Sequence, residues 1–128
     1  MEPVGTLDVV AIDCNDPEPL IEFWSVVLGT SVRSRDATWI SLHPLIPGGP
    51  HLAFQVVPER KVGKNRLHLD VNVRGIAAAI ARASDLGATP VGVVVEEDDG
   101  RFQVMHDPGG NEFCLVEWDR DLEQETTG

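Results

Sequence analysis

Basic residues are scarce in this sequence. Ten lysines and arginines stand against 21 aspartates and glutamates, which gives a formal net charge of −11 at pH 7. Nucleic acids and anionic membranes both bind proteins through basic surface, so neither is an expected partner. The exception to this trend is a cluster of four basic residues within seven positions: Arg60, Lys61, Lys64 and Arg66. It indicates either a surface that attracts an anionic ligand or a set of ion pairs with the abundant carboxylates.

Cysteines and long apolar runs are also few. Cys14 and Cys114 are the two cysteines of the chain, too few for a disulfide framework. No apolar run reaches the length of about 18 residues that a membrane-spanning helix needs. Residues 1–5 lack the basic and apolar regions of a secretory signal. The expected location is therefore the cytoplasm, where thiols stay reduced.

The first half of the chain predicts one strand, one helix and three further strands. Residues 7–14 are short, β-rich and bounded by turn residues, as in a strand. Asp16 and Pro17 are typical of a helix start, and Gly29 is typical of a helix end. Between them an apolar stripe of helical period predicts a helix over 17–28; its members are Leu20, Phe23, Trp24, Val27 and Leu28. The three strands are expected near residues 30–36, 38–43 and 51–57.

The second half repeats this order. Residues 66–73 alternate polar and apolar side chains, as a half-buried strand does, and a helix is expected over 75–86. Leu86-Gly87 at its end matches Leu28-Gly29 at an offset of 58 residues. Strands are expected near 89–97, 101–106 and 112–118. An internal repeat is stronger evidence for a fold than any local motif, and this one predicts two βαβββ units.

The repeat, the Leu-Gly after each helix and the closing phrase Asp-Pro-Gly-Gly-Asn-Glu-Phe-Cys-Leu at residues 107–115 resemble the vicinal oxygen chelate superfamily. Its members include glyoxalase I, extradiol dioxygenases and bleomycin-resistance proteins. The resemblance implies an α+β fold of two tandem βαβββ modules whose curved mixed sheets form a cup. We expect one domain over 1–128, with a first module at about 6–58, a linker at 59–65, a second module at about 66–118 and a polar tail at 119–128.

The resemblance also implies where a metal would be held. Metal-dependent members place four inward-pointing ligands, commonly His and Glu, one on the first and one on the last strand of each unit. The matching positions here are Val9, Phe54 (or Gln55, if the alignment shifts by one), His68 and Cys114. Val and Phe donate nothing to a metal, whereas a catalytic site normally needs three protein ligands. We therefore expect no metal site and no cofactor.

His68 is the leading candidate for catalysis. An ordinary imidazole pKa of about 6.5 suits proton transfer at neutral pH. The alternative is a buried structural histidine bonded to Asp70, which lies on the same strand face two residues later. Cys114 is a candidate ligand-binding residue, as a soft ligand or a nucleophile, or else a small buried hydrophobe.

Three residues of the first unit are further candidates for ligand binding. Gln55 offers an amide that holds a substrate carbonyl, or else bonds within the sheet edge. Phe54 and Trp39 are candidate walls of the cup, and Trp39 is alternatively a core residue. On the last strand, Glu112 shares a face with Cys114, whereas Glu117 falls on the opposite face and is a poor substitute ligand. His43, His51 and His106 are expected to be exposed or structural.

Three functions fit these observations. The first is a metal-independent module that binds a small molecule in its cup. The second is a metal-dependent lyase, isomerase or dioxygenase of the glyoxalase-like type, with a degenerate site around His68. The third is a structural or regulatory partner module. A homodimer is expected, because the superfamily commonly completes its cups by pairing and symmetric pairs are the commonest oligomers.

Overall fold

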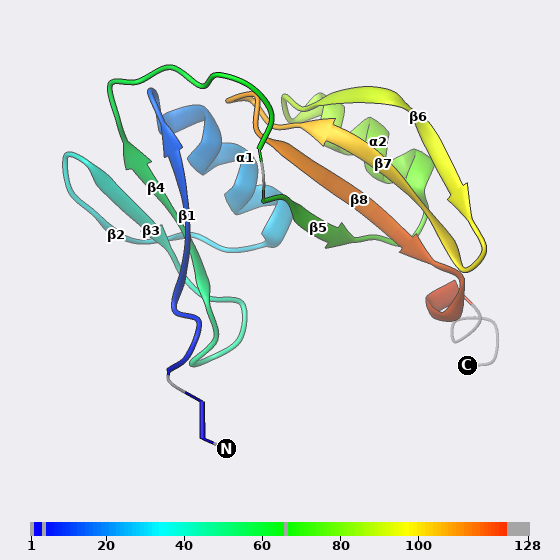
Figure 1. Cartoon of the computed structure of the whole chain (residues 1–128), viewed down its shortest axis with the longest axis horizontal. Coiled ribbons are helices and arrows are strands. Elements are labelled where there is room, and N and C mark those ends of the chain that lie inside the picture. The colour runs from blue at the N-terminus through cyan, green and yellow to red at the C-terminus, as the bar shows by residue number, and fades with distance from the viewer. Residues whose placement is uncertain (1, 4, 66, 123–128) are drawn as a thin grey trace. The chain divides into compact units, whose positions relative to one another are not determined.

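The computed structural model describes residues 2–3, 5–65 and 67–122. The chain divides into two compact units, the first ending at Lys61 and the second beginning at Val62. Each unit contains one strand, one helix and three further strands (Figure 1). The first unit consists of β1 (Val9–Cys14), α1 (Glu18–Leu28), β2 (Val32–Arg35), β3 (Trp39–Leu42) and β4 (His51–Val56). The second consists of β5 (Leu69–Asn72), α2 (Ile76–Asp85), β6 (Thr89–Glu97), β7 (Gly100–His106) and β8 (Glu112–Trp118).

The two sheets have the same topology. The strand order is β1-β4-β3-β2 in the first unit and β5-β8-β7-β6 in the second. In each, the first strand pairs in parallel with the last, and the remaining pairs are antiparallel. A parallel pair needs a long crossover, which the helix and two strands between them supply. This arrangement confirms the predicted α+β fold of two βαβββ modules.

Local sequence explains where α1 begins and ends. The Asp16 carboxylate accepts the backbone N–H of Glu18 at 3.2 Å, and Pro17 supplies a helical φ of −77°. Gly29 ends the helix in the left-handed conformation, with a φ of 66°, which a residue with a Cβ adopts only at a cost. The first part of the apolar stripe is buried, with Leu20, Phe23 and Trp24 each 1% exposed, and Val27 and Leu28 are half-buried.

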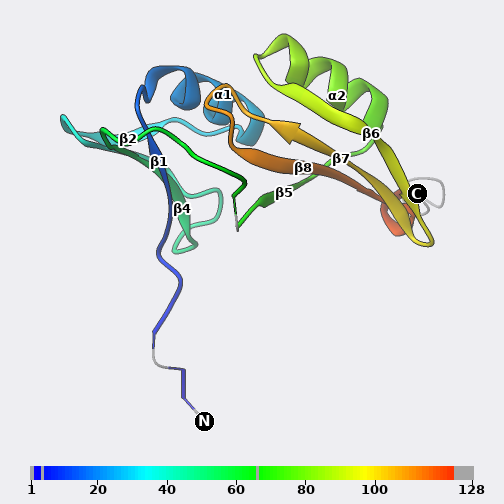
Figure 2. The same cartoon turned by 45° about the horizontal axis from the view of Figure 1, so that its top comes forward.

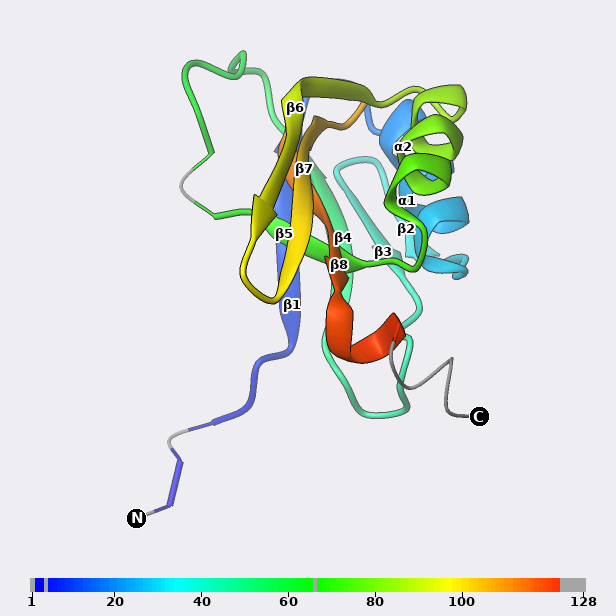
Figure 3. The same ribbon diagram turned by 90° about the vertical axis from the view of Figure 1, so that its right-hand side faces the viewer.

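In the first unit, α1 lies at one side of the sheet (Figure 3). Ile40 pairs with Phe54, and both are buried, at 2% and 0% exposure. Because side chains alternate along a strand, the next pair points to the opposite face, and it joins Trp39 to Gln55. Phe54 and Gln55 therefore belong to opposite faces of β4.

In the second sheet, α2 covers one face and leaves the other open (Figure 2). Met105, Phe113 and Leu115 are buried and alternate with side chains of the open face. Gly110 and the other residues of the β7–β8 turn are fixed by Asp107, whose carboxylate accepts the backbone N–H groups of Gly109 and Asn111 at 2.9 Å. The phrase that carries the family resemblance thus builds the turn that sets the register of β8.

Two boundaries differ from the sequence prediction. The strand expected over 66–73 begins at Leu69, and Arg66 of the basic cluster lies outside the described residues. In the expected polar tail, residues 119–122 are helical, and residues 123–128 lie outside the described part of the chain. Among the described helices, none has both the length and the apolar character needed to cross a membrane.

Candidate functional site

The open face of the second sheet contains a hollow of about 360 Å³. Its apolar wall comes from β7 and β8, as Phe102, Val104, Val116 and Trp118. The other lining residues are all ionisable: Lys64, His68, Asp70, Glu97, Arg101, Glu112 and Cys114. All of these residues belong to the second unit. A cavity with an apolar wall and a few converging polar groups is typical of small-molecule sites, and this volume lies within their usual range.

Strand register explains why these residues meet. Cys114 of β8 pairs with Asp70 of β5 on one side and with Val104 of β7 on the other. Directly paired residues point to the same face of a sheet, so this row lies across the floor of the hollow. Phe102 and Val116 form the next row of the same face.

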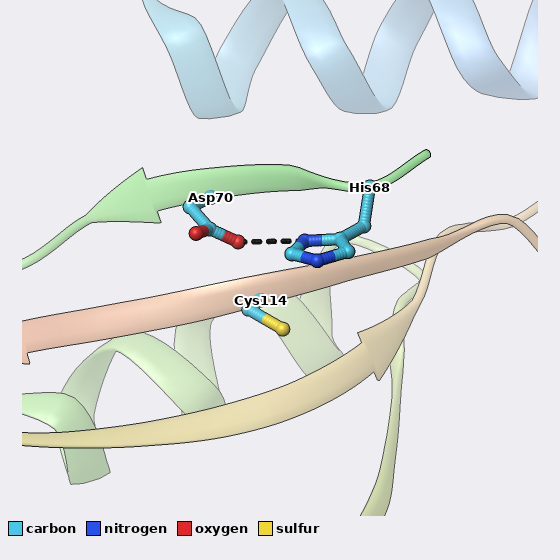
Figure 4. Close-up of side chains that lie close together, drawn as sticks. All are labelled: His68, Asp70 and Cys114. Atoms are coloured by element: carbon cyan, nitrogen blue, oxygen red, sulfur yellow. Dashed lines mark hydrogen bonds and ion pairs between the residues drawn. The ribbon is translucent and has the colours of Figure 1, made fainter. Parts of the chain in front are cut away.

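His68, Asp70 and Cys114 form a compact cluster in the hollow (Figure 4). His68 Nδ1 lies 2.8 Å from Asp70 Oδ1, and one ligand atom from each of the three residues lies within 4.8 Å of the others. The predicted contact between His68 and Asp70 is therefore present. The accompanying expectation that this histidine is buried is wrong, because 53% of its side chain is exposed. His68 lies immediately before β5 begins, so its side chain extends past the end of the strand and is exposed.

Burial raises the pKa of the Cys114 thiol, and the nearby carboxylates of Asp70 and Glu112 raise it further. Lys64 acts in the opposite direction. The thiol is therefore held in its neutral form at neutral pH. A nucleophilic or metal-binding cysteine needs its thiolate, so this environment opposes both roles that the sequence suggested for Cys114.

We predict that alkylation of Cys114 depends on these charges. Asp70→Asn and Glu112→Gln each remove a negative charge, which lowers the thiol pKa and should raise the alkylation rate by about two- to fivefold between about pH 7 and about pH 8. Lys64→Met should slow the reaction. Iodoacetamide labelling followed by peptide mass spectrometry separates Cys114 from Cys14. Glu22→Gln, on the exposed side of α1, is the matched control. An unchanged or slower rate in Asp70→Asn would contradict the electrostatic account.

Glu112 and Glu117 lie on the faces that alternation predicted. Glu112 lines the hollow and is 17% exposed, with Lys64 Nζ at 3.8 Å and His106 Nε2 at 3.9 Å from its carboxylate oxygens. Glu117 lies on the other face, 5% exposed, and accepts the backbone N–H of Ile76 at 2.8 Å. It therefore caps α2 and is not available to the hollow.

A divalent metal would find three donors here instead of the two counted from the sequence, because Asp70 joins His68 and Cys114. Imidazole, carboxylate and thiolate are all zinc ligands, and three is the usual number in a catalytic site. The donor types therefore fit a zinc-like ion, on the condition that the Cys114 thiol loses its proton.

The candidates of the first unit do not all share one face. Trp39 and Gln55 are direct partners on β3 and β4, and the Trp39 indole N–H donates to Ser41 Oγ at 2.9 Å. Val9 pairs with His51, whose ring lies 3.3 Å from the Arg33 guanidinium. Phe54, expected to contact a ligand, is fully buried on the opposite face of β4, so we assign it to the core.

Six lining residues were missed from the sequence: Glu97, Arg101, Phe102, Val104, Val116 and Trp118. Arg101 donates to Glu96, Glu117 and Asp119 at 3.1, 2.6 and 2.7 Å. Pairing across β7 and β8 brings Arg101 opposite Glu117 and Gly100 opposite Trp118. Because side chains alternate along β8, Val116 and Trp118 share the face of Cys114, so Trp118 could have been predicted from the sequence. The contacts of Arg101 could not, because they depend on the register between strands.

Two βαβββ modules, each with a four-stranded mixed sheet, form the fold of the vicinal oxygen chelate superfamily. The family model for the glyoxalase-like domain matches residues 9–116, and the chain belongs to that family. A comparison with curated protein sequences finds no match.

Solved structures show the same fold at low sequence identity. A glyoxalase/bleomycin resistance protein/dioxygenase family enzyme from Burkholderia phytofirmans PsJN has a TM-score of 0.72 and 19% identity, over 89% of this chain and 99% of that one. A glyoxalase-related enzyme from Fulvimarina pelagi has a TM-score of 0.70 and 17% identity, over 89% and 88%. The oxidase ChaP-H2 has a TM-score of 0.67 and 18% identity, over 90% and 94%.

Proposed function

We propose that this protein binds a small molecule in the hollow of its second unit, without a resident divalent metal. The observation that carries the proposal is the pairing of an apolar wall with a polar cluster. Phe102, Val104 and Val116 remove apolar ligand surface from water, while His68 and Asp70 offer hydrogen bonds that orient it. The neutral Cys114 thiol favours a site without metal, because a thiolate would first have to form.

Two further expectations belong to this proposal. We place the protein in the cytoplasm, in keeping with its few cysteines, and we propose that it acts as a homodimer. The family resemblance supports pairing. In the second unit, β5 and β6 are edge strands, and Val93 of β6 is 80% exposed. Such edges are surfaces on which another chain can pair.

Filling the hollow should weaken ligand binding. Val104→Trp places an indole in the apolar wall, and we expect it to weaken the binding of hollow-specific compounds by about tenfold or more. Val93→Trp is the matched control, because it makes the same change at an exposed site that does not line the hollow. Ligands come from a fragment library screened by NMR in the presence of a chelator, and calorimetry gives their affinities. The proposal fails if no fragment binds in a way that Val104→Trp disrupts.

A metal-dependent enzyme of the glyoxalase-like type is the second candidate. The three donors His68, Asp70 and Cys114 within 4.8 Å of one another favour it. A divalent ion would supply Lewis-acid chemistry toward vicinal substrate oxygens. His68, Asp70 and Cys114 would hold the ion, and the Glu112 carboxylate beside them would accept a proton. Elemental analysis of untagged protein tests this candidate. About one metal per chain, lost in His68→Ala, would place the enzyme ahead of the metal-free binding module.

A further inference from the structure

The lining of the hollow is acidic. Asp70, Glu97 and Glu112 contribute three carboxylates from three different strands. The arginine and lysine among the lining residues are Arg101 and Lys64, and the pairing of Arg101 with Glu117 places the Arg101 side chain on the face that α2 covers. The formal charges of the lining residues sum to a negative value. How much of this negative charge acts on a ligand depends on whether Lys64 and Arg101 neutralise the lining carboxylates or are paired elsewhere.

Arg101 does not offset these carboxylates, because its charge is already matched. Its guanidinium donates to Glu96, Glu117 and Asp119, and these three hydrogen bonds raise the pKa of Arg101 well above its ordinary value. Glu96, Arg101 and Glu117 form one cross-strand row on the face that α2 covers, so Arg101 is neutralised by its own partners there.

Lys64 is a weak counterion. Its side chain is 77% exposed, and its ammonium lies 3.8 Å from one oxygen of Glu112, the less exposed partner at 17%. An ion pair with one exposed, flexible partner contributes little and is screened by salt.

The apolar wall is also suited to positive charge. The face of an aromatic ring attracts cations, as at Trp118, whose ring is already occupied by the Arg120 guanidinium 5.2 Å from its centroid. Phe102 lies on the same sheet face as Cys114 and offers a second ring. Acidic groups above an apolar wall match a ligand that has an apolar body and one cationic group.

We propose that the hollow selects small organic cations, such as a protonated amine on an aromatic or aliphatic body. The inference rests on the proposed function, since it names the class of ligand for the same site. Asp70, Glu97 and Glu112 receive the ammonium, and the wall of β7 and β8 receives the body.

Three probes of nearly equal shape test the charge preference: 1-naphthylmethylamine, 1-naphthylmethanol and 1-naphthoic acid. They are titrated by calorimetry at neutral pH, low salt and with a chelator present, which separates an organic cation from a metal. The amine should bind about tenfold or more tightly than the alcohol, and the acid should bind most weakly. Added salt should weaken the amine and leave the alcohol nearly unchanged.

Single variants then locate the charge. Asp70→Asn, Glu97→Gln and Glu112→Gln should each reduce amine affinity by about two- to tenfold without changing the alcohol. Glu22→Gln removes one carboxylate from α1 of the first unit and should change neither. A cation attracted only by the net charge of the chain would respond equally to all four variants, and that result would overturn the inference.

The outcomes separate this inference from the proposed function. Equal affinity for amine and alcohol, or tighter binding of the acid, overturns the preference while the hollow remains a binding site. Failure of the amine to bind, when library fragments bind in a way that Val104→Trp disrupts, overturns the preference alone. Failure of the probes and of the whole library overturns both.

Discussion

Phe54→Ala should destabilise the first unit by about 3–5 kcal/mol. The ring is fully buried beside Ile40, and its removal loses the transfer free energy of the ring and leaves a cavity in the core. Neighbouring Leu42 and Leu52, at 1% and 7% exposure, are held by strand pairing and cannot collapse fully into the space. Urea denaturation followed by tryptophan fluorescence measures the change, since Trp24 and Trp39 both lie in this unit.

Gln55→Ala is the matched control, one residue further along β4. Gln55 is exposed and lies on the opposite face, so the free energy of unfolding should change by less than about 0.5 kcal/mol. If Phe54→Ala lowered the free energy of unfolding only slightly, or by no more than Gln55→Ala, the Phe54 side chain would not face the core. Phe54 would then return as a candidate for contact with a ligand.

This pair marks the point where the sequence was ambiguous. An amphipathic strand reveals its facing through alternation, but His51, Leu52, Ala53 and Phe54 are all buried. Because four consecutive residues are buried, the sequence pattern fits equally well when the alignment shifts by one position. Such a shift exchanges the faces assigned to Phe54 and Gln55. Facing could be assigned only from the pairing of β4 with β3.

The fold itself could be predicted because its signals repeat. Gly29 and Gly87 follow their helices with positive φ values of 66° and 110°, and Leu20, Phe23 and Trp24 of the apolar stripe in α1 are buried as its period indicated. The element order then occurs twice in one short chain, so an error in one half would have conflicted with the other. Strand ends were less accurate, as at β5, because hydrogen bonding to β8 determines where that strand begins.

The site was predicted only where neighbours in sequence are also neighbours in space. His68 and Asp70 are two residues apart, and their contact followed from strand geometry. Cys114 joins them through pairing of β5 with β8, which the family resemblance supplied. Arg101 gave no such signal, because its three carboxylate partners come together through a hairpin and a cross-strand pair.

Glu117→Ala should destabilise the second unit by about 3 kcal/mol. One oxygen of this buried carboxylate accepts the backbone N–H groups of Gly75 and Ile76 at the start of α2. The other accepts Arg101 Nη1 at 2.6 Å. Alanine leaves two helix donors without their partner and takes one of three carboxylates from the guanidinium. Glu117→Gln keeps an oxygen for the helix and should recover part of the loss.

Glu96→Ala separates these contributions, because Glu96 also binds Arg101 but its side chain is 69% exposed. An exposed ion pair contributes about 0–1 kcal/mol, so this variant should remain close to the parent protein. Urea denaturation of the three variants, with Arg101→Met added to form a double-mutant cycle with Glu117→Ala, measures the coupling directly. If Glu117→Ala and Glu96→Ala were equally mild, Glu117 would be one interchangeable carboxylate around Arg101. A large loss for Glu117→Ala with weak coupling to Arg101 would instead assign its main role to the start of α2.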